Sequence, residues 1–280
     1  MDRRRVLAAA LALAVTVATA SCDVQVGQDG GLSFDVASGR AQDTWTRSYT
    51  LASGGRLELI NVNGTIAAEP SSGTEVELTG ERIAKASSDE AARELLGKVE
   101  MREEAGASQV RVEVRSARHF GLGGLEVRWT VKVPKGAVVD LRTTNGKVQL
   151  TGLTGEVHAR TVNGGVTGRG LAVQVLEAST VNGGVDVEIA EPLGGDARVS
   201  LVCVNGGVQL ALPGDSKASV LARVTNGGIS TGDLTLQPTG EQTRRRVEGT
   251  LNGGGASVTL ETTNGGVRLT RSSVQSKSTS

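Results

Sequence analysis

The sequence contains very few aromatic residues, prolines and cysteines. Aromatic residues make up 2% of the 280 positions, and there are only 5 Pro and 2 Cys. Without large rings, the core must be assembled from Val, Leu, Ile and Ala in thin layers of similar size. Gly is abundant, with 39 residues, and many Gly combined with few Pro indicate ordered turns rather than a flexible low-complexity chain.

The sequence also lacks an excess of either charge and lacks recognisable catalytic motifs. Lys+Arg and Asp+Glu balance at 30 each, so we expect no nucleic-acid partner. No metalloprotease, Cys-x-x-Cys, nucleophile-elbow or Walker motif is present. His119 and His158 are far apart in the chain, and we expect His158 to be solvated on the polar face of a strand. These absences predict a non-enzyme without metal or cofactor.

The first 21 residues predict a signal peptide. Three Arg precede an apolar stretch at residues 6–20, which is too short for a comfortable membrane span and typical of a signal core. It ends at Thr19-Ala20-Ser21-Cys22, which resembles the lipobox of bacterial lipoproteins, although an aliphatic residue is usual in place of Thr19. We expect lipidation of Cys22, which makes the membrane a partner; ordinary cleavage near Ala20 is the alternative. Both outcomes predict export to the cell envelope, in the periplasm or at the cell surface.

The rest of the chain divides into three segments by pattern. Residues 22–42 are polar and Gly-rich and predict a flexible tether, and residues 271–280 predict a disordered tail. Residues 43–270 predict a single β-repeat domain. Within it, a capping Ser followed by acidic residues and two Leu predicts one short helix over residues 88–97.

A repeat centred on Asn-Gly dominates the predicted domain. Aligned on the Asn, the positions six and four before it are always apolar, the position two before it is most often Thr, and the position three after it is always β-branched. Mostly polar positions lie between them, which is the alternation of a strand with one buried face. The repeated residues are Asn63, Asn145, Asn163, Asn182, Asn205, Asn226 and Asn264.

Two architectures are compatible with this repeat. Asn-Gly is a strong signal for a two-residue hairpin, which would give an antiparallel β-sandwich or meander. In a β-solenoid, or β-helix-like fold, Asn-Gly-Gly is instead a corner, and equal positions stack along the axis. The five Asn from Asn145 to Asn226 recur every 18 to 23 residues, the length of one coil, and Gly follows Asn-Gly in five of seven copies. We therefore predict an all-β, single-domain β-solenoid with one short helix insertion, and the sandwich or meander is the alternative.

The repeated Asn are interpreted as a structural corner motif rather than a ligand-binding row. Asn tolerates a left-handed backbone, and its amide can bond to the Asn of the next coil. Cys203 occupies the Thr column and is interpreted as a Thr-sized core residue. Among the polar columns, Arg142, Arg160 and Arg223 could attract an anionic polymer, although a solvated face is the simpler interpretation. Residues 244–246, three consecutive Arg, form a second basic segment in an expected loop.

Several segments are similar to the putative adhesin domain family, repetitive bacterial envelope proteins of largely unknown function. The resemblance covers residues 47–270 and is carried by motifs such as Leu141-Arg142-Thr143-Thr144-Asn145-Gly146 and Leu260-Glu261-Thr262-Thr263-Asn264-Gly265. It implies a β-solenoid-like fold, periplasmic or surface placement, and no catalytic residues. The sequence departs from the family where Gly follows Asn-Gly, a place where the family often has Ser or Asp.

These observations predict an exported, lipid-anchored and non-catalytic adhesin-like binding or scaffold module with a protein or glycan partner. The first alternative is an envelope-stress sensor that acts through a partner protein. The second is a polysaccharide-acting enzyme on a β-helix, which requires two carboxylates within about 10 Å of each other in a groove.

Overall fold

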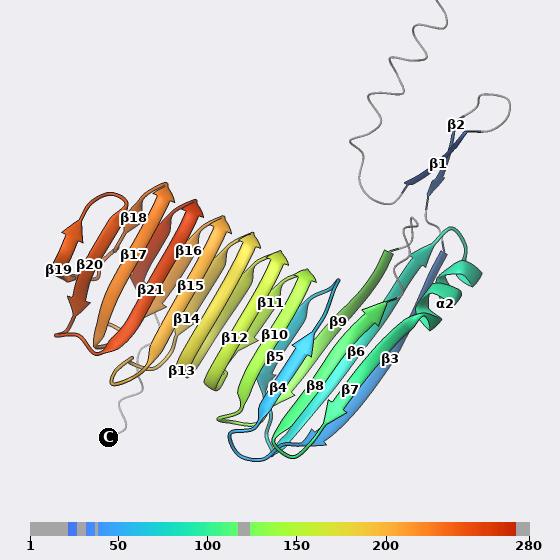
Figure 1. Cartoon of the computed structure of the whole chain (residues 1–280), viewed down its shortest axis with the longest axis horizontal. Helices are drawn as coiled ribbons and strands as arrows, with labels where there is room; N and C mark the ends of the chain where they lie inside the picture. Colours follow the sequence, from blue (N-terminus) through green and yellow to red (C-terminus); the bar gives the residue numbers. More distant parts are fainter. Residues whose placement is uncertain (1–21, 27–31, 37–38, 117–123, 273–280) are drawn as a thin grey trace, which may run out of the picture. The chain divides into compact units, whose positions relative to one another are not determined.

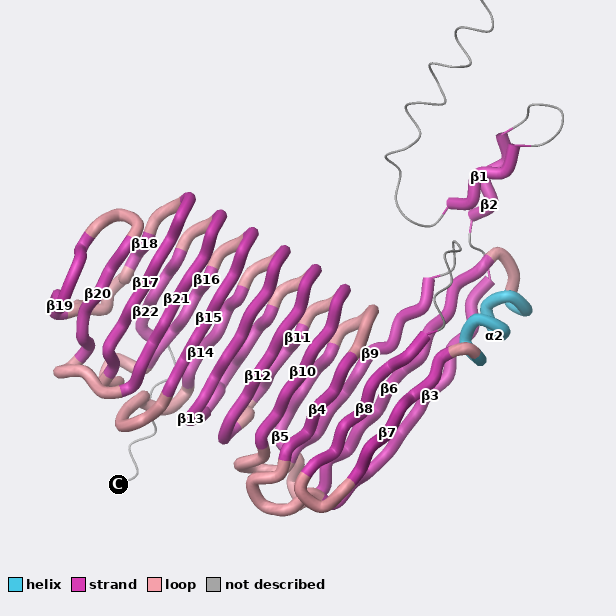
Figure 2. The backbone as a smooth tube through the Cα atoms, in the orientation of Figure 1, coloured by secondary structure: helices cyan, strands magenta, loops and turns pink. Residues whose placement is uncertain are grey.

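The computed structural model describes residues 22–26, 32–36, 39–116 and 124–272, and it is an all-β fold with one short helix (Figure 1, Figure 2). The chain divides into two compact units, which are described separately. The smaller comprises Met1–Asp43, Arg82–Val99 and Ser116–Leu125, and the larger comprises Thr44–Glu81, Glu100–Arg115 and Glu126–Ser280.

In the smaller unit, two short strands lie within the segment predicted as a tether. β1 (Cys22–Val26) pairs antiparallel with β2 (Leu32–Val36), and β3 (Gly39–Thr50) begins before the expected end of the tether. The predicted signal peptide lies outside the described residues, as does residue 273 onward of the predicted tail. Of that tail, Arg271 still belongs to a strand and the Ser272 amide donates to the Leu212 carbonyl at 2.7 Å.

The single helix of the described residues, α2 (Asp89–Gly97), confirms the prediction for this segment. Ser88 caps it by accepting a hydrogen bond from the Ala91 amide at 3.2 Å. Ala92 and Leu96 on its buried face pack against Ala84 near the end of β6 (Glu75–Ala86). A small apolar cluster therefore holds the helix to its unit.

In the larger unit, the strands that lead into the Asn corners form one parallel stack, here called stack 1. Residues of equal repeat position face each other in every pair, for example Leu141 opposite Ala159. The neighbours in space are β8–β4–β10–β12–β13–β15–β21–β17. Their bounds are β4 (Arg56–Ile60), β8 (Gln109–Ser116), β10 (Val138–Asn145), β12 (Thr154–Asn163), β13 (Val166–Asn182), β15 (Arg198–Asn205), β17 (Ala218–Asn226) and β21 (Ala256–Asn264).

The strands that leave the corners form a second parallel stack, stack 2. The β-branched residue three positions after each Asn again faces its equivalents, as Val148 faces both Val166 and Ile66. The neighbours in space are β9–β5–β11–β13–β14–β16–β22–β18. Their bounds are β5 (Ile66–Pro70), β9 (Gly124–Val133), β11 (Val148–Thr151), β14 (Val185–Ile189), β16 (Val208–Leu212), β18 (Ile229–Ser230) and β22 (Val267–Arg271), and β13 belongs to both stacks.

The order of the coils in space differs from their order in sequence. β21 and β22, the last coil of the chain, lie between β15–β16 and β17–β18. The intervening β19 (Gln237–Gln242) and β20 (Arg246–Leu251) form an antiparallel pair, and β20 covers the other edge of β17. Since that edge is taken, the returning chain pairs on the side of β17 that faces β15.

The buried columns form the core, as their apolar pattern predicts. Leu57, Val139 and Val157 are fully buried six positions before the Asn, and the column four before the Asn is buried as well. At the other end of the larger unit, Trp45 of β3 meets the buried Trp129 edge to face, with ring centroids 5.5 Å apart. β7 (Val99–Ala105) contributes Glu103, which accepts a hydrogen bond of 2.5 Å from the Tyr49 hydroxyl.

Candidate functional site

The structure brings all seven repeated Asn together in one row along the corner. Six of the seven side-chain amides donate to the side-chain oxygen of a neighbouring Asn over 2.7 to 3.0 Å, and Asn63 at one end of the row accepts such a bond from Asn145. The row is Asn63, Asn145, Asn163, Asn182, Asn205, Asn264 and Asn226. Because these amide groups hydrogen-bond to each other, the geometry supports a structural role for the row. Fewer of their donors and acceptors are left for a ligand than their exposed position suggests.

The backbone of the corner differs from our expectation in one respect. The left-handed residue is the Gly after each Asn in most copies, not the Asn itself; within the described residues Asn252 is the one non-Gly residue with positive φ, at 50°. A Cβ atom on that Gly would also collide with the neighbouring coil: at Gly206 it would lie 1.6 Å from the Gly183 carbonyl oxygen. The first Gly of the corner is therefore required by packing.

The residues two positions before the repeated Asn are buried beneath the corner and hydrogen-bond to the backbone of neighbouring coils. Thr161, Thr180 and Thr262 donate to Gly carbonyls of neighbouring coils over 2.9, 2.7 and 2.8 Å. Cys203 does the same through its thiol, with a Sγ–O distance of 3.0 Å to Gly183. Burial raises the pKa of the Cys203 thiol, so a thiolate nucleophile is disfavoured there.

Polar and charged side chains form a continuous series of contacts across the outer face of stack 1, here called the ion network. Each arginine and each carboxylate in it lies within 4 Å of an opposite charge on the same strand or one or two strands away, and His158 joins the series through contacts of its ring nitrogens with Glu156 and Glu177. The members are Arg115, Glu113, Arg111, Glu58, Arg142, Asp140, Arg56, Glu156, His158, Glu177 and Arg160. Side-chain hydrogen bonds to carboxylates raise the pKa of both Arg111 and Arg142.

This network corrects two expectations. His158 is not a solvated side chain: its imidazole is 15% exposed and its two ring nitrogens lie 2.8 Å from Glu156 and 3.0 Å from Glu177. Arg142 and Arg160 are neutralised within the network, and Arg223 pairs with Glu261 at 3.5 Å. The three arginines therefore do not form an unpaired basic face. His119 lies outside the described residues.

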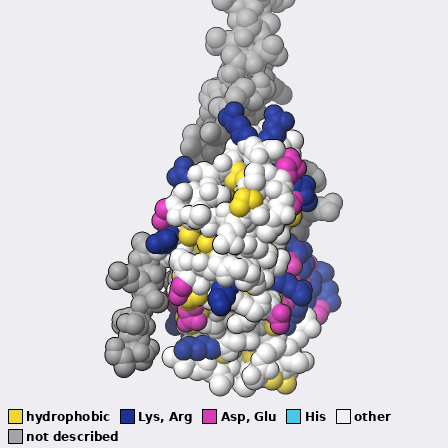
Figure 3. Space-filling model, turned by 90° about the vertical axis from the view of Figure 1, so that its left-hand side faces the viewer, with side chains coloured by type: hydrophobic (Ala, Val, Ile, Leu, Met, Phe, Trp, Pro, Cys, Tyr) yellow, Lys and Arg dark blue, Asp and Glu magenta, His cyan; other side chains and the backbone are white. Residues whose placement is uncertain are grey.

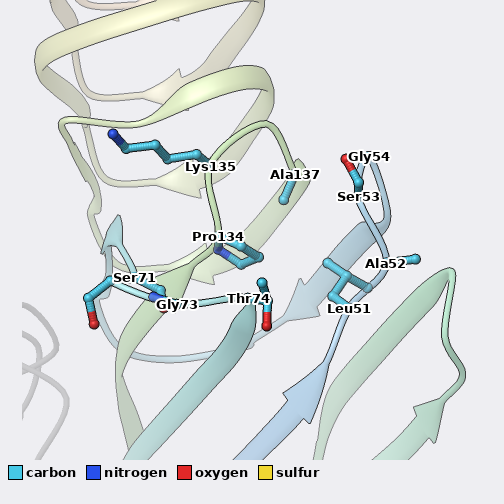
Figure 4. A pocket seen from close by; sticks show the side chains of 11 residues that line it. Leu51, Ala52, Ser53, Gly54, Ser71, Gly73, Thr74, Pro134, Lys135 and Ala137 are labelled. Carbon is cyan, nitrogen blue, oxygen red and sulfur yellow. Dashed lines mark hydrogen bonds between the residues drawn. The ribbon is translucent and has the colours of Figure 1, made fainter.

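The described residues of the larger unit line at least three hollows. The first, of about 580 Å³, lies between the loops at residues 51–54, 71–74 and 134–137 (Figure 4). Ser, Thr and Gly dominate its lining, and Figure 4 shows the Lys135 side chain extending away from Leu51 and Thr74. A second hollow of about 290 Å³ includes Glu191 and Pro192. The described residues contain no group of three or more His, Cys, Asp or Glu arranged to hold a metal ion.

The third hollow is a groove of about 330 Å³ beside the corner, where the second Gly of the motif forms the floor. Its lining residues are Gly207, Gln209, Gly228, Ser230, Gly266, Val267 and Arg268. Packing does not require these glycines: a Cβ atom at Gly207 or Gly266 would meet its nearest neighbour at 3.5 Å. The sequence shows the row of glycines but not the groove, because the groove depends on which coils are adjacent.

Cys22, the predicted lipidation site, begins β1 and pairs with Val36 through the backbone. The residues that precede it lie outside the described part of the chain, so lipidation stays a prediction. In the described segments no helix has both the length and the apolar character that a membrane crossing requires.

A solved structure of a known protein shares the fold of this chain, and at its low sequence identity it shows nothing about the function of this chain. The structure is similar to that of a putative cell adhesion protein from Clostridium sporogenes ATCC 15579, with a TM-score of 0.53 and 12% identity over 83% of this chain and 100% of that one. A putative adhesin from Bacteroides fragilis NCTC 9343 aligns with a TM-score of 0.35, at 10% identity over 81% of this chain and 96% of that one. No family model and no curated protein matches the sequence.

Proposed function

We propose that this protein is an exported, non-catalytic binding module of the adhesin-like type, built on a β-solenoid and anchored to a membrane through Cys22. The observation that carries the proposal is the parallel pairing of equal repeat positions across both stacks, which presents one regular polar face over many coils. Extended repeat surfaces of this kind suit extended partners. The name of the Clostridium protein, with which the fold is shared, agrees with an adhesive role.

The arrangement of the carboxylates supports a role without catalysis. Glu58 and Asp140 both contact Arg142, at 3.4 and 2.6 Å, so two carboxylates do lie close together. They lie largely buried on the outer face of stack 1, however, and each is paired with arginine, whereas glycoside hydrolysis requires two carboxyl groups that flank a bound sugar in a cleft. Of the linings of the three hollows, one contains a carboxylate, Glu191.

Two experiments test this proposal. For the anchor, metabolic labelling with palmitate should mark the wild-type protein and leave Cys22→Ser unlabelled, and an unlabelled wild type would remove the lipid anchor from the proposal. For binding, the purified full chain should co-sediment with isolated cell envelopes, and a chain that stays in the supernatant at every envelope concentration would contradict the binding function. Extracts treated to remove either protein or glycan would then identify the class of partner.

A further inference from the structure

The larger unit carries a second kind of charged surface, in which the arginines lack acidic partners. Among the described residues, Arg244, Arg245 and Arg268 take part in no salt bridge, although all three are exposed. Arg246 next to them differs, since it pairs with both Glu241 and Glu248. Residues 241–248 thus contain three Arg and two Glu, and Arg268 adds a further positive charge. A net positive charge is therefore left at this place.

Two of these arginines border the groove beside the corner. Arg268 lines it directly, between Gln209 and Ser230 in the register of stack 2. Arg244 lies over its end, because its Nε would be 3.6 Å from a Cβ atom on Gly228. The turn that carries Arg244 is fixed to β17 and β18 by backbone hydrogen bonds: the Ile229 amide donates to the Arg244 carbonyl at 3.2 Å, and the Val224 amide donates to the Arg245 carbonyl at 2.9 Å.

The turn joins β19 to β20 at the end of the larger unit that faces the viewer in Figure 3, where Lys and Arg side chains lie at the upper edge of the coloured surface. Gly228, Gly266 and Gly207 form the floor of the groove, and the second Gly of the next two corners, Gly184 and Gly165, continues the same row of glycines beyond it. Strands lie about 4.8 Å apart, so this bare strip extends for roughly 20 Å. The glycines leave the groove open because they have no side chains, and the unpaired positive charge favours an anionic ligand.

We propose that the groove bordered by Arg244 and Arg268 binds an acidic linear polysaccharide, with its carboxylates at the arginines and its sugar rings along the glycine floor. Guanidinium groups pair with carboxylates in a bidentate geometry, and the side chains of Gln209 and Ser230 can hydrogen-bond to sugar hydroxyls. No large exposed apolar residue lines the groove, which argues against insertion into a lipid surface. This inference rests on the proposed binding function and names its site and ligand class.

The test measures binding of the purified full chain to polygalacturonate, with neutral dextran as the uncharged comparison. The double variant Arg244→Gln/Arg268→Gln should weaken polygalacturonate binding by about tenfold or more, since two charged contacts are lost. The matched control is Arg160→Gln/Arg223→Gln, which removes the same charge from arginines that already have acidic partners, and its affinity should stay within about twofold of wild type.

A second variant fills the groove without changing its charge. Gly207→Thr/Gly266→Thr places at both positions the residue that Thr65 already supplies in the first copy of the corner. It should keep the wild-type melting temperature within a few degrees and lose most of the binding. The proposal is overturned if the wild type does not bind polygalacturonate at low salt, if dextran binds equally well, if the two arginine double variants bind alike, or if only vesicles with anionic lipids are bound. Envelope co-sedimentation that persists in those cases would leave the broader binding function standing.

Discussion

The coils on the two sides of β13 share one folding device and differ in the surface built upon it. On the β4, β10 and β12 side, the outer charges pair within the ion network, and Thr65 and Lys147 occupy the place after Asn-Gly in two of the coils. On the β15, β21 and β17 side, that place is always Gly, and Arg268 and Arg244 lack partners. The corner and the buried columns, which both sides share, stabilise the fold. The surface charges and the residue after Asn-Gly differ between the sides, so a binding function is expected in these features.

The largest expected effect comes from the shared part, the first Gly of the corner. Gly206→Ala places a Cβ atom 1.6 Å from the Gly183 carbonyl oxygen at a residue with φ of 150°, so we expect a loss of about 4 kcal/mol or more in the free energy of unfolding. Its neighbour is the control: Gly207→Ala should be neutral or stabilising by about 0.5 kcal/mol. Urea unfolding monitored by circular dichroism measures both. Equal losses would mean that both glycines are required by packing and that the groove floor is structural.

The next effect is expected in the ion network. Glu58→Gln keeps the shape of the side chain and removes a charge that contacts Arg111 at 2.5 Å and Arg142 at 3.4 Å. Since the Glu58 side chain is 11% exposed, we expect a loss of about 2 kcal/mol. Glu261→Gln, on the other side of β13, breaks an exposed pair and should cost about 0.5 kcal/mol. Unfolding at low and high salt compares the two, and similar small losses would show that the network contributes no more than isolated surface pairs.

The Asn row should give a graded effect along the corner. Asn182→Ala removes two side-chain bonds, to Asn163 and from Asn205, and should cost about 2 kcal/mol at about 1 kcal/mol for each bond. Asn226 stands at the end of the row and bonds to Asn264 alone among the seven, so Asn226→Ala should cost about half as much. If instead a substitution within the row abolished ligand binding without changing stability, the Asn would be a recognition element and not a corner.

Much of the fold could be predicted from the sequence because it depends on local pattern. The buried columns, the corner and the helix capped by Ser88 follow from alternation and capping alone. The place of β21 between β15 and β17 could not be predicted, because every copy has the same apolar columns and any two coils would match equally well. His158 and Arg142 each have one partner two residues away on the same strand, Glu156 and Asp140, and one on a neighbouring strand, Glu177 and Glu58. The contacts between strands, which join the ion network together, could not be predicted from the sequence. The unpaired Arg268 was missed for the same reason.

Cys203 offers a smaller and more local test. Cys203→Thr should stay within about 1 kcal/mol of wild type, because Thr161 and Thr180 make the equivalent bond elsewhere in the column. Cys203→Ala removes both volume and the bond to Gly183 and should cost about 1.5 kcal/mol. A thiol reagent supplies a second measurement: the buried thiol, with its raised pKa, should react only in urea. Reaction in the native protein would show that this corner opens.

The smallest expected effect distinguishes the two sides by their response to acid. The hydrogen bond and charge of Arg115, together with Arg111, lower the pKa of Glu113. A carboxyl group with a lowered folded-state pKa stabilises the fold above its ordinary pKa of about 4.3, and this contribution is lost as the pH falls through the folded-state value. Because Glu113 lies near the surface, the share is a few tenths of a kcal/mol. Between about pH 5 and pH 3 the wild type should therefore lose slightly more stability than Glu113→Gln.

Hydrogen exchange over the same pH interval compares the two sides directly. We expect exchange in β8 and β4 to increase before exchange in β21 and β17, because the outer face of β21 and β17 carries fewer carboxylates. The opposite order would mean that the paired charges do not determine how their coils respond to acid.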